Sequence, residues 1–124
     1  MSSQIRTYED LIAWQRAMAL AKTVYRITES MPAAETFGLR LQMRRAAVSV
    51  PSNIAEGYAR GSLKDYLKFL RIARGSLAEL STQHRLGIEI GSLGLDPTAR
   101  ELIAETDRVL QGLITSLCRK QSPQ

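Results

Sequence analysis

The stretch LRLQMRRAAVSVPSNIAEG, residues 39–57, decides the fold, because two stripes of different chemistry run along it at helical spacing. The apolar stripe consists of Leu39, Met43, Ala46, Val50 and Ile54. The polar stripe beside it consists of Gln42, Arg45, Ser49, Asn53 and Glu56. A helix face open to water rarely places such polar side chains directly against an apolar stripe. We therefore expect part of the polar stripe to be buried and hydrogen-bonded.

Proline interrupts the same stretch. The spacing predicts a helix from residue 35 or 36 to residue 57 or 58, and Pro51 lies inside it. Proline removes the amide that would donate to the carbonyl of Ala47, so we expect a kink or a local break. Ser49 and Asn53 flank this position and can bond to freed backbone groups. The alternative is two helices, with Pro51 in the first turn of the second and Ser49 as its cap.

Three further amphipathic segments surround this helix. Thr7 and Asp10 form a capping pattern that predicts a helix over 8–29, and Ser62 with Asp65 predicts another over 63–90. Asp96 before a proline predicts a last helix over 97–117. The apolar seam of the third helix is Leu63, Leu67, Leu70, Ala73, Leu77, Leu80 and His84. The seam of the last helix is Leu102, Thr106, Val109, Leu113 and Leu117, with Ile103, Leu110 and Ile114 alongside.

The length and the loops define the fold class. A chain of 124 residues fits one domain with its own core, which we expect to be ordered over about residues 7–118. Short turns rich in glycine or proline separate the four segments, and no strand-like alternation competes with them. The sequence therefore predicts an all-α protein, an antiparallel up-down-up-down four-helix bundle that occupies the whole chain.

The first helix carries two apolar faces. One consists of Leu11, Trp14, Met18, Ala21 and Tyr25. The second consists of Ala13, Ala17, Leu20, Val24 and Ile27. Together they cover roughly 200° of the helix, about twice the usual core-facing stripe. We expect one face to pack in the bundle and the second face to form an oligomer interface with another subunit, the alternative being a helix buried deeply in a single chain.

The polar stripe predicts a structural network. If the second and third helices are antiparallel about a turn near Ala59, contacting residues have numbers that add up to about 120. A buried Arg45–Glu79 pair would then fix the register of this hairpin. The expected network is Gln42, Arg45, Ser49, Asn53, Glu56, Ser76 and Glu79. No nucleophile and base accompany it, so its predicted role is structural and not catalytic.

The positive charge is concentrated in the middle of the chain. The formal net charge is +5, and residues 35–86 alone hold nine Lys and Arg against four Asp and Glu. Such an excess suits nucleic acid or another acidic partner, and the simpler alternative is a solvated basic surface. The candidate nucleic-acid-binding residues are Arg40, Arg44, Arg60, Lys64, Lys68, Arg71 and Arg74. Their contacts with phosphates would be electrostatic and weakly specific for sequence.

The sequence offers no reactive constellation. One histidine and one cysteine cannot complete a usual metal site, and the glycines form neither a phosphate-binding loop nor a dinucleotide motif. We expect no cofactor and no enzymatic activity, with His84 as an interior histidine and Cys118 as a small hydrophobe near the end of the bundle. No signal peptide or apolar run of about 20 residues is present, so we expect a cytoplasmic protein that does not enter membranes.

The chain resembles a four-helix bundle family, the proteins encoded in intervening sequences of bacterial 23S ribosomal RNA genes, also called the S23 ribosomal protein family. The resemblance covers about residues 8–117. The residues that carry it are Leu11, Trp14, Pro32, Glu35, Phe37, Gly38, Leu39, Gln42, Arg44, Arg45, Ala46, the run SVPSNIAEG at 49–57, Phe69, Leu70, Ala73, Gly75, Ser76 and Glu79. It implies an up-down four-helix bundle and a homopentamer, a ring of bundles around a central channel.

A distant relative of this family is the accessory protein of diversity-generating retroelements, a basic pentameric bundle that binds nucleic acid and a reverse transcriptase. We therefore expect a cytoplasmic homopentamer that binds nucleic acid, RNA before DNA, through its basic surface. The alternative is a scaffold whose basic face meets an acidic protein. Charge reversal at Lys64, Lys68 and Arg71 separates these two hypotheses.

Overall fold

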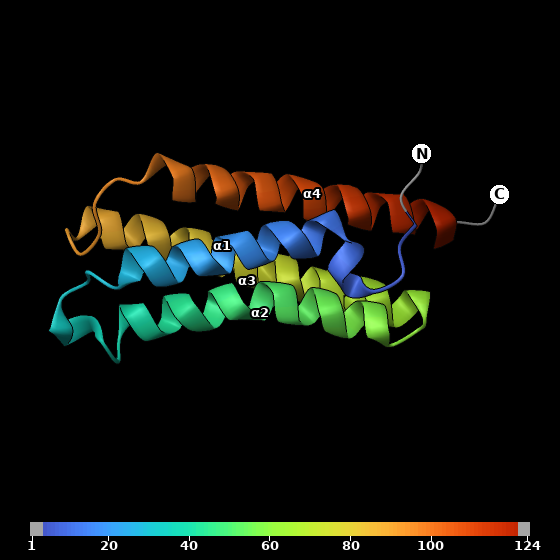
Figure 1. Ribbon diagram of the computed structural model, residues 1–124, viewed down its shortest axis with the longest axis horizontal. Helices are drawn as coiled ribbons and strands as arrows, with labels where there is room; N and C mark the ends of the chain where they lie inside the picture. The colour runs from blue at the N-terminus through green and yellow to red at the C-terminus, as the bar shows by residue number, and fades with distance from the viewer. Residues whose placement is uncertain (1–3, 122–124) are drawn as a thin grey trace.

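Four long helices run antiparallel to one another in the order of the chain (Figure 1). The computed structural model describes residues 4–121. A 3₁₀ turn, η1 (Tyr8–Asp10), precedes α1 (Ile12–Thr28), and a second, η2 (Ala33–Glu35), precedes α2 (Leu39–Ala59). The long helices α3 (Leu63–Glu89) and α4 (Pro97–Gln121) follow. The described residues contain no strand, so the predicted all-α bundle is confirmed.

Each helix packs against its two neighbours around a single core. The closest pairing is α2 with α3, while α1 packs on α2 and α4, and α4 packs on α3. Helices α1 and α3 are therefore diagonal across the bundle, as are α2 and α4. Leu20, Met43, Ile54, Leu70 and Leu110 are among the fully buried side chains, so all four helices contribute to the core. Burial of such apolar surface is the main force that holds the bundle together.

The predicted cap at Thr7 and Asp10 begins a 3₁₀ turn and not the first α-helix. The Asp10 carboxylate accepts hydrogen bonds from the amides of Arg6 and Thr7 at 2.8 and 3.1 Å. This cap closes only η1, because Leu11 is extended (φ −73°, ψ 128°) and α1 begins after it. The extended residue buries the Leu11 side chain in the core. The expected single helix over 8–29 is therefore wrong at its first turn.

Proline does not break the second helix. Helix α2 continues through Pro51, whose ring is buried, so the alternative of two separate helices is wrong. The Asn53 amide donates to the carbonyl of Ser49 at 2.8 Å and to its hydroxyl at 2.9 Å. The Ser49 hydroxyl in turn lies 2.8 Å from the hydroxyl of Ser76 on α3. Asn53 thus reinforces the turn around the proline, and Ser49 links that turn to the neighbouring helix.

The α2–α3 hairpin is the tightest part of the bundle. Gly61 makes its turn with φ +82°, and the Ser62 hydroxyl caps α3 by accepting from the amide of Asp65 at 3.1 Å. A Cβ on Gly57 would lie 2.8 Å from Cβ of Phe69, so glycine permits this close approach. The predicted seam of α3 is buried from Leu67 to His84, and only Leu63 remains half-exposed.

The last helix meets the core through residues of both predicted stripes. Asp96 caps α4 by accepting from the amide of Ala99 at 3.0 Å, as its position before proline predicts. Ile103, Thr106 and Leu110 are buried, whereas Leu102 and Val109 are half-buried. The two predicted stripes lie side by side along one face of α4, and the line between them points toward the core.

The predicted oligomer interface on α1 is wrong, because its side chains form the core of their own chain. Ala13, Ala17, Leu20 and Val24 are buried among the other helices, and Ile27 is half-buried. They face inward because this is the side of α1 that meets both α2 and α4. Of the other apolar face, Leu11 and Ala21 are buried, while Trp14 and Met18 are half-buried and Tyr25 is exposed. That face borders α2 at the surface.

Candidate nucleic-acid interface

The polar stripe of α2 is only partly paired. Ser49, Asn53 and Ser76 are joined by hydrogen bonds, but Gln42, Arg45, Glu56 and Glu79 are exposed. No hydrogen bond or ion pair within residues 4–121 joins Arg45 to Glu79, so the predicted buried pair is wrong. Glu56 pairs instead with Arg60 on its own helix, at 2.8 Å. The helices approach too closely at Ser49 and Ser76 to enclose longer polar side chains.

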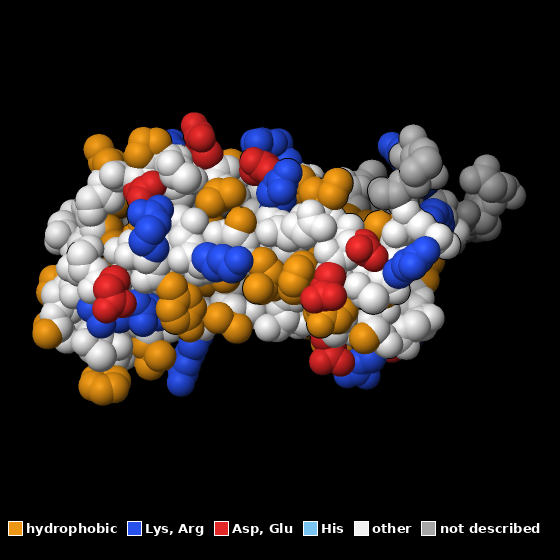
Figure 2. All heavy atoms as spheres, in the orientation of Figure 1, with side chains coloured by type: hydrophobic (Ala, Val, Ile, Leu, Met, Phe, Trp, Pro, Cys, Tyr) orange, Lys and Arg blue, Asp and Glu red, His pale blue; other side chains and the backbone are white. Residues whose placement is uncertain are grey.

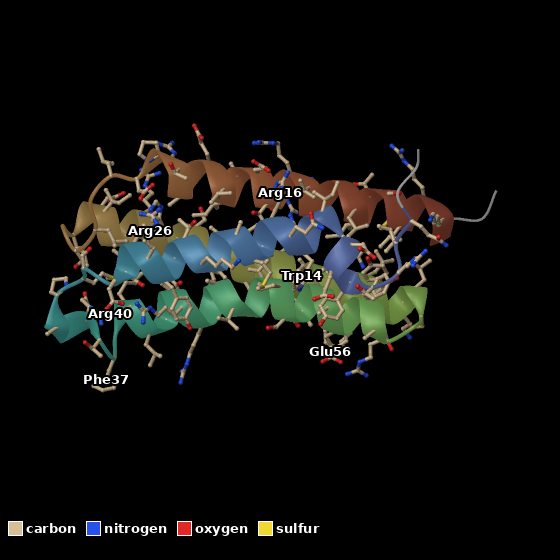
Figure 3. The ribbon with its side chains drawn as sticks, in the orientation of Figure 1. Trp14, Arg16, Arg26, Phe37, Arg40 and Glu56 are labelled. Atoms are coloured by element: carbon tan, nitrogen blue, oxygen red, sulfur yellow. The ribbon has the colours of Figure 1, made fainter. Side chains whose placement is uncertain are left out.

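Arg40 and Arg44 anchor the end of α1 and do not belong to a basic surface. The Arg40 guanidinium donates to the carbonyls of Glu29 and Met31 at 3.2 and 2.8 Å (Figure 3). Arg44 is closer to the helix end itself. Its side chain, 21% exposed, donates to the Thr28 hydroxyl, the Tyr25 carbonyl and the Glu29 carboxylate. Two arginines thus satisfy carbonyls that the end of a helix leaves open, where its dipole attracts positive charge.

This position separates Arg40 and Arg44 from the other predicted residues. They lie at the end of the bundle where α1 passes into α2, whereas α3 begins at the opposite end (Figure 1). Arg40 and Arg60 are twenty residues apart on one helix, which corresponds to about 30 Å. The prediction of one continuous basic surface from Arg40 to Arg74 is therefore wrong.

A smaller cluster of positive charge remains at the opposite end, which we call the basic end. Its members come from the first turns of α3 and the last turn of α4. The two helices are in contact here, because the Arg71 guanidinium donates to Sγ of Cys118 at 3.3 Å. The basic end consists of Lys64, Lys68, Arg71, Arg119 and Lys120. All five side chains are exposed, and none forms an ion pair with an acidic residue in residues 4–121.

Arg60 and Arg74 border this cluster but are partly engaged. Arg60 pairs with Glu56 and lies over the ring of Phe69, 5.0 Å from its centroid. Arg74 pairs with Asp107 on α4 at 3.1 Å and is exposed. Both guanidinium groups remain near solvent, and their positive charge is offset by neighbouring carboxylates. They add less to the potential of the surface than the five members of the basic end.

The backbone adds to the positive potential of the basic end. Lys64 lies in the first turn of α3, where the helix dipole is positive and where a cation weakens the helix, and Lys68 follows in the second turn. Lys64 therefore does not stabilise the start of α3. A positive helix end together with unpaired lysines is an arrangement that attracts anions such as phosphate groups.

The aromatic residues nearby serve packing. Tyr58 and Tyr66 meet edge to face with ring centroids 5.9 Å apart, and both are half-buried. Burial raises the pKa of Tyr66 to about 12, so this phenol stays neutral. These rings face each other between α2 and α3 and offer no open surface on which nucleic-acid bases could stack. The basic end is therefore suited to backbone phosphates and not to the reading of bases.

The model of one protein family matches most of the chain. That family is described as 23S rRNA-intervening sequence protein, and the match covers residues 9–115. The chain belongs to this family. The resemblance that we based on the run SVPSNIAEG is thereby confirmed, with bounds within two residues of those expected. A search of curated proteins finds no match to the chain.

Two grooves mark the surface of this 23S rRNA-intervening sequence family member. The larger, of about 1190 Å³, lies between α3 and α4 and is lined by Arg74, Ser81, His84 and Arg100, among others. His84 is only 5% exposed, and its Nε2 has no hydrogen-bond partner. Burial lowers the pKa of His84, so the ring is neutral near pH 7. Within the described chain, no nucleophile is hydrogen-bonded to this histidine.

The second groove lies between α1 and α2 and is almost entirely apolar. Its volume is about 580 Å³, and Figure 2 shows hydrophobic side chains gathered along the boundary of the two helices. The lining residues are Tyr8, Trp14, Met18, Ala21, Lys22, Tyr25, Val48, Pro51, Ser52 and Ala55. Tyr8 and Trp14 pack edge to face, 5.4 Å apart, and hold one end of the groove.

Sequence reasoning missed two features of the surface. Arg119 and Lys120 join the basic end because α4 returns antiparallel to α3. The turn at residues 91–95 indicates this reversal, but it does not show which residues of α3 and α4 lie side by side. The α1–α2 groove, which the sequence did not predict, lies at the apolar face of α1 that we expected to pack in the bundle. Within residues 4–121, no helix is apolar over a length that would cross a bilayer. The same residues contain no cluster of three acidic, histidine or cysteine side chains placed to hold a metal ion.

Proposed function

We propose that this protein is a non-enzymatic, self-assembling helical bundle that binds nucleic acid, RNA in the first place, through its basic end. The observation that carries the proposal is the cluster of Lys64, Lys68 and Arg71 beside Arg119 and Lys120. These five cations are exposed and form no ion pair within residues 4–121, and one of them, Lys64, occupies a helix position that disfavours positive charge. Such a site favours a partner with closely spaced negative charges.

Nucleic acid matches this description better than a small anion does. The lysines and the arginine of α3 recur at steps of four and three residues, so they form one row along the helix. Each step corresponds to about 5 Å along the helix axis, so the row presents closely spaced positive charges. A row of cations without base-reading side chains predicts binding with little sequence preference.

Self-assembly completes the proposal. The resemblance to the family implies a homopentamer, and the exposed apolar surface of α1, α2 and α3 supports association of several copies. In an assembly each copy contributes one basic end, so the phosphate contacts of several copies add together. Multivalent contacts of this kind strengthen binding without any new type of contact.

The experiment is the binding of labelled structured RNA and duplex DNA at several salt concentrations. The protein is compared with a variant that carries Lys64→Glu, Lys68→Glu and Arg71→Glu. We expect a steep decrease of affinity with salt for the protein itself. The variant should lose at least ten-fold in affinity, and the slope of log K against log salt should become shallower by about 2 to 3, because each phosphate contact on duplex DNA contributes about 0.9 to it.

A control variant with Arg85→Glu, Arg100→Glu and Arg108→Glu has the same net charge but leaves the basic end intact. We expect it to retain most of the affinity, with a small uniform loss from the changed net charge. Equal losses in the two variants would contradict the localised site. If the unmodified protein binds neither RNA nor DNA at low salt, the nucleic-acid proposal fails, and an acidic protein becomes the partner to seek.

A further inference from the structure

Helix α3 carries an exposed ridge on the side that faces away from the core. Its residues recur at steps of four and three, the spacing of a helix seam that contacts another helix. The ridge consists of Ile72, Gly75, Glu79, Thr82 and Leu86. All five are exposed, and Ile72 and Leu86 are 43% and 49% accessible. Ile72 and Leu86 lie four turns apart on the same face of α3 as Gly75.

The glycine in the ridge has no close neighbour among residues 4–121. A Cβ on Gly75 would meet nothing within 4 Å, in contrast to Gly57, where the neighbouring helix leaves no room. A glycine inside a helix lowers its stability by about 1 kcal/mol relative to alanine. The open space above Gly75 therefore suits the close approach of a helix from outside the chain.

The α1–α2 groove has the complementary shape and chemistry. It is a channel between two antiparallel helices, lined by apolar side chains such as Met18 and Val48, with Lys22 as its one charged lining residue. The ridge has one acidic side chain, Glu79, at its centre. The aliphatic side chains of the ridge thus match the apolar lining of the groove, and the negative charge of Glu79 matches the positive charge of Lys22.

We propose that the α3 ridge of one copy packs into the α1–α2 groove of a second copy. This inference rests on the self-assembly in the proposed function and names the two surfaces that meet. Because α1 and α3 are diagonal in the bundle, the ridge and the groove point in different directions, and one chain uses both at once. The contact is therefore head-to-tail, which generates a ring or a chain of copies and not a two-fold dimer.

Point variants on each surface test the contact. One variant carries Ile72→Asp and Leu86→Asp in the ridge, and another carries Val48→Asp in the groove. All three positions are exposed in the single chain, so the bundle itself should fold, which circular dichroism checks. Sedimentation velocity at micromolar concentration should show the unmodified protein as an oligomer and each variant as a monomer. The control is Phe37→Asp, a side chain 87% exposed at the end of the bundle, which should remain oligomeric.

Mixing the two monomeric variants distinguishes head-to-tail packing from other arrangements. The ridge variant retains an intact groove, and the groove variant retains an intact ridge, so the mixture can form one contact. We expect a complex of one copy of each variant and nothing larger. Failure of the mixture to associate would overturn the proposal, as would ridge variants that remain fully assembled.

The result also separates this inference from the proposed function. If the unmodified protein is a monomer, self-assembly fails together with the interface. If the protein is an oligomer that the ridge and groove variants leave intact, only the named interface fails. Binding of RNA by the monomeric variants, measured in parallel, reports on the basic end independently of either result.

Discussion

The Arg44 guanidinium donates from Nε to the hydroxyl of Thr28 at 2.9 Å and lies over the ring of Tyr25, 4.5 Å from its centroid. The Thr28 hydroxyl is buried and itself donates to the carbonyl of Val24 at 2.7 Å. An arginine from α2 thus completes the last turn of α1. This junction explains why Arg44, which we assigned to a basic surface from the sequence, stabilises the fold instead.

Replacement of Arg44 by alanine should destabilise the bundle by about 2 kcal/mol. The change leaves the buried Thr28 hydroxyl and the carbonyl of Tyr25 without their charged donor. Urea unfolding measures the effect. Arg44→Lys keeps the charge but loses the planar donor set, so we expect an intermediate loss. A normal stability together with reduced RNA affinity in Arg44→Ala would show that this residue belongs to the binding surface after all.

Two glycine substitutions should have opposite signs. Gly57→Ala places a Cβ 2.8 Å from Cβ of Phe69 and 3.2 Å from the carbonyl oxygen of Tyr66, so α2 and α3 must separate. We expect a loss of about 1–3 kcal/mol from this overpacking. Gly112→Ala on α4 meets nothing within 4 Å and should gain about 0.5–1 kcal/mol through helix propensity. Thermal unfolding of the two variants compares them directly, and a stabilising Gly57→Ala would contradict the close helix contact.

The stability of the bundle should decrease when the pH falls below the pKa of a free histidine. Burial lowers the pKa of His84 from 6.5, and Arg100 nearby lowers it further, while Asp96 acts in the opposite direction. Below pH 6.5 the unfolded chain takes up a proton that the folded chain does not, so the free energy of unfolding falls. The effect is complete once the pH is below the pKa in the folded protein, and it is absent above about pH 7.

Urea unfolding between pH 7.5 and pH 5 measures this dependence. His84→Leu removes the titrating group from its buried site and should flatten the curve in this range. Asp10, whose pKa is lowered by hydrogen bonds from the backbone amides of Arg6 and Thr7, titrates at more acidic pH and does not interfere. A slope that persists unchanged in His84→Leu would assign the dependence to another group.

Removal of the cap of α4 should lower stability by about 1 kcal/mol. Asp96→Ala loses the hydrogen bond to the amide of Ala99 and the contact with Arg26 at 3.6 Å. Asp96→Asn keeps a capping oxygen and loses the charge, so it should retain most of the stability. Thermal unfolding compares the three proteins, and equal stabilities of the alanine and asparagine variants would show that the ion pair, and not the cap, matters.

Local patterns were sufficient for the elements of this fold. Helical spacing and caps such as Ser62 and Asp96 depend on residues only three or four apart, so four helices and their starts could be predicted to within a few residues. The 3₁₀ start at Tyr8 could not, and the sequence left open whether α2 continues through Pro51 as one helix. Both depend on contacts with other elements, the packing of Leu11 into the core and the link from Ser49 to Ser76.

By itself, the sequence determined the helices, the bundle and the family, because each follows from the order and spacing of residue types along the chain. Only the tertiary structure decided which face of α1 is interior, which arginines are engaged and where positive charge remains free. Arg44 and Arg71 are both arginines on polar helix faces, but one meets the carbonyls at the end of α1 and the other lies on an open surface beside Cys118. A side chain's role depends on what the fold places opposite it, and helix spacing alone does not contain that information.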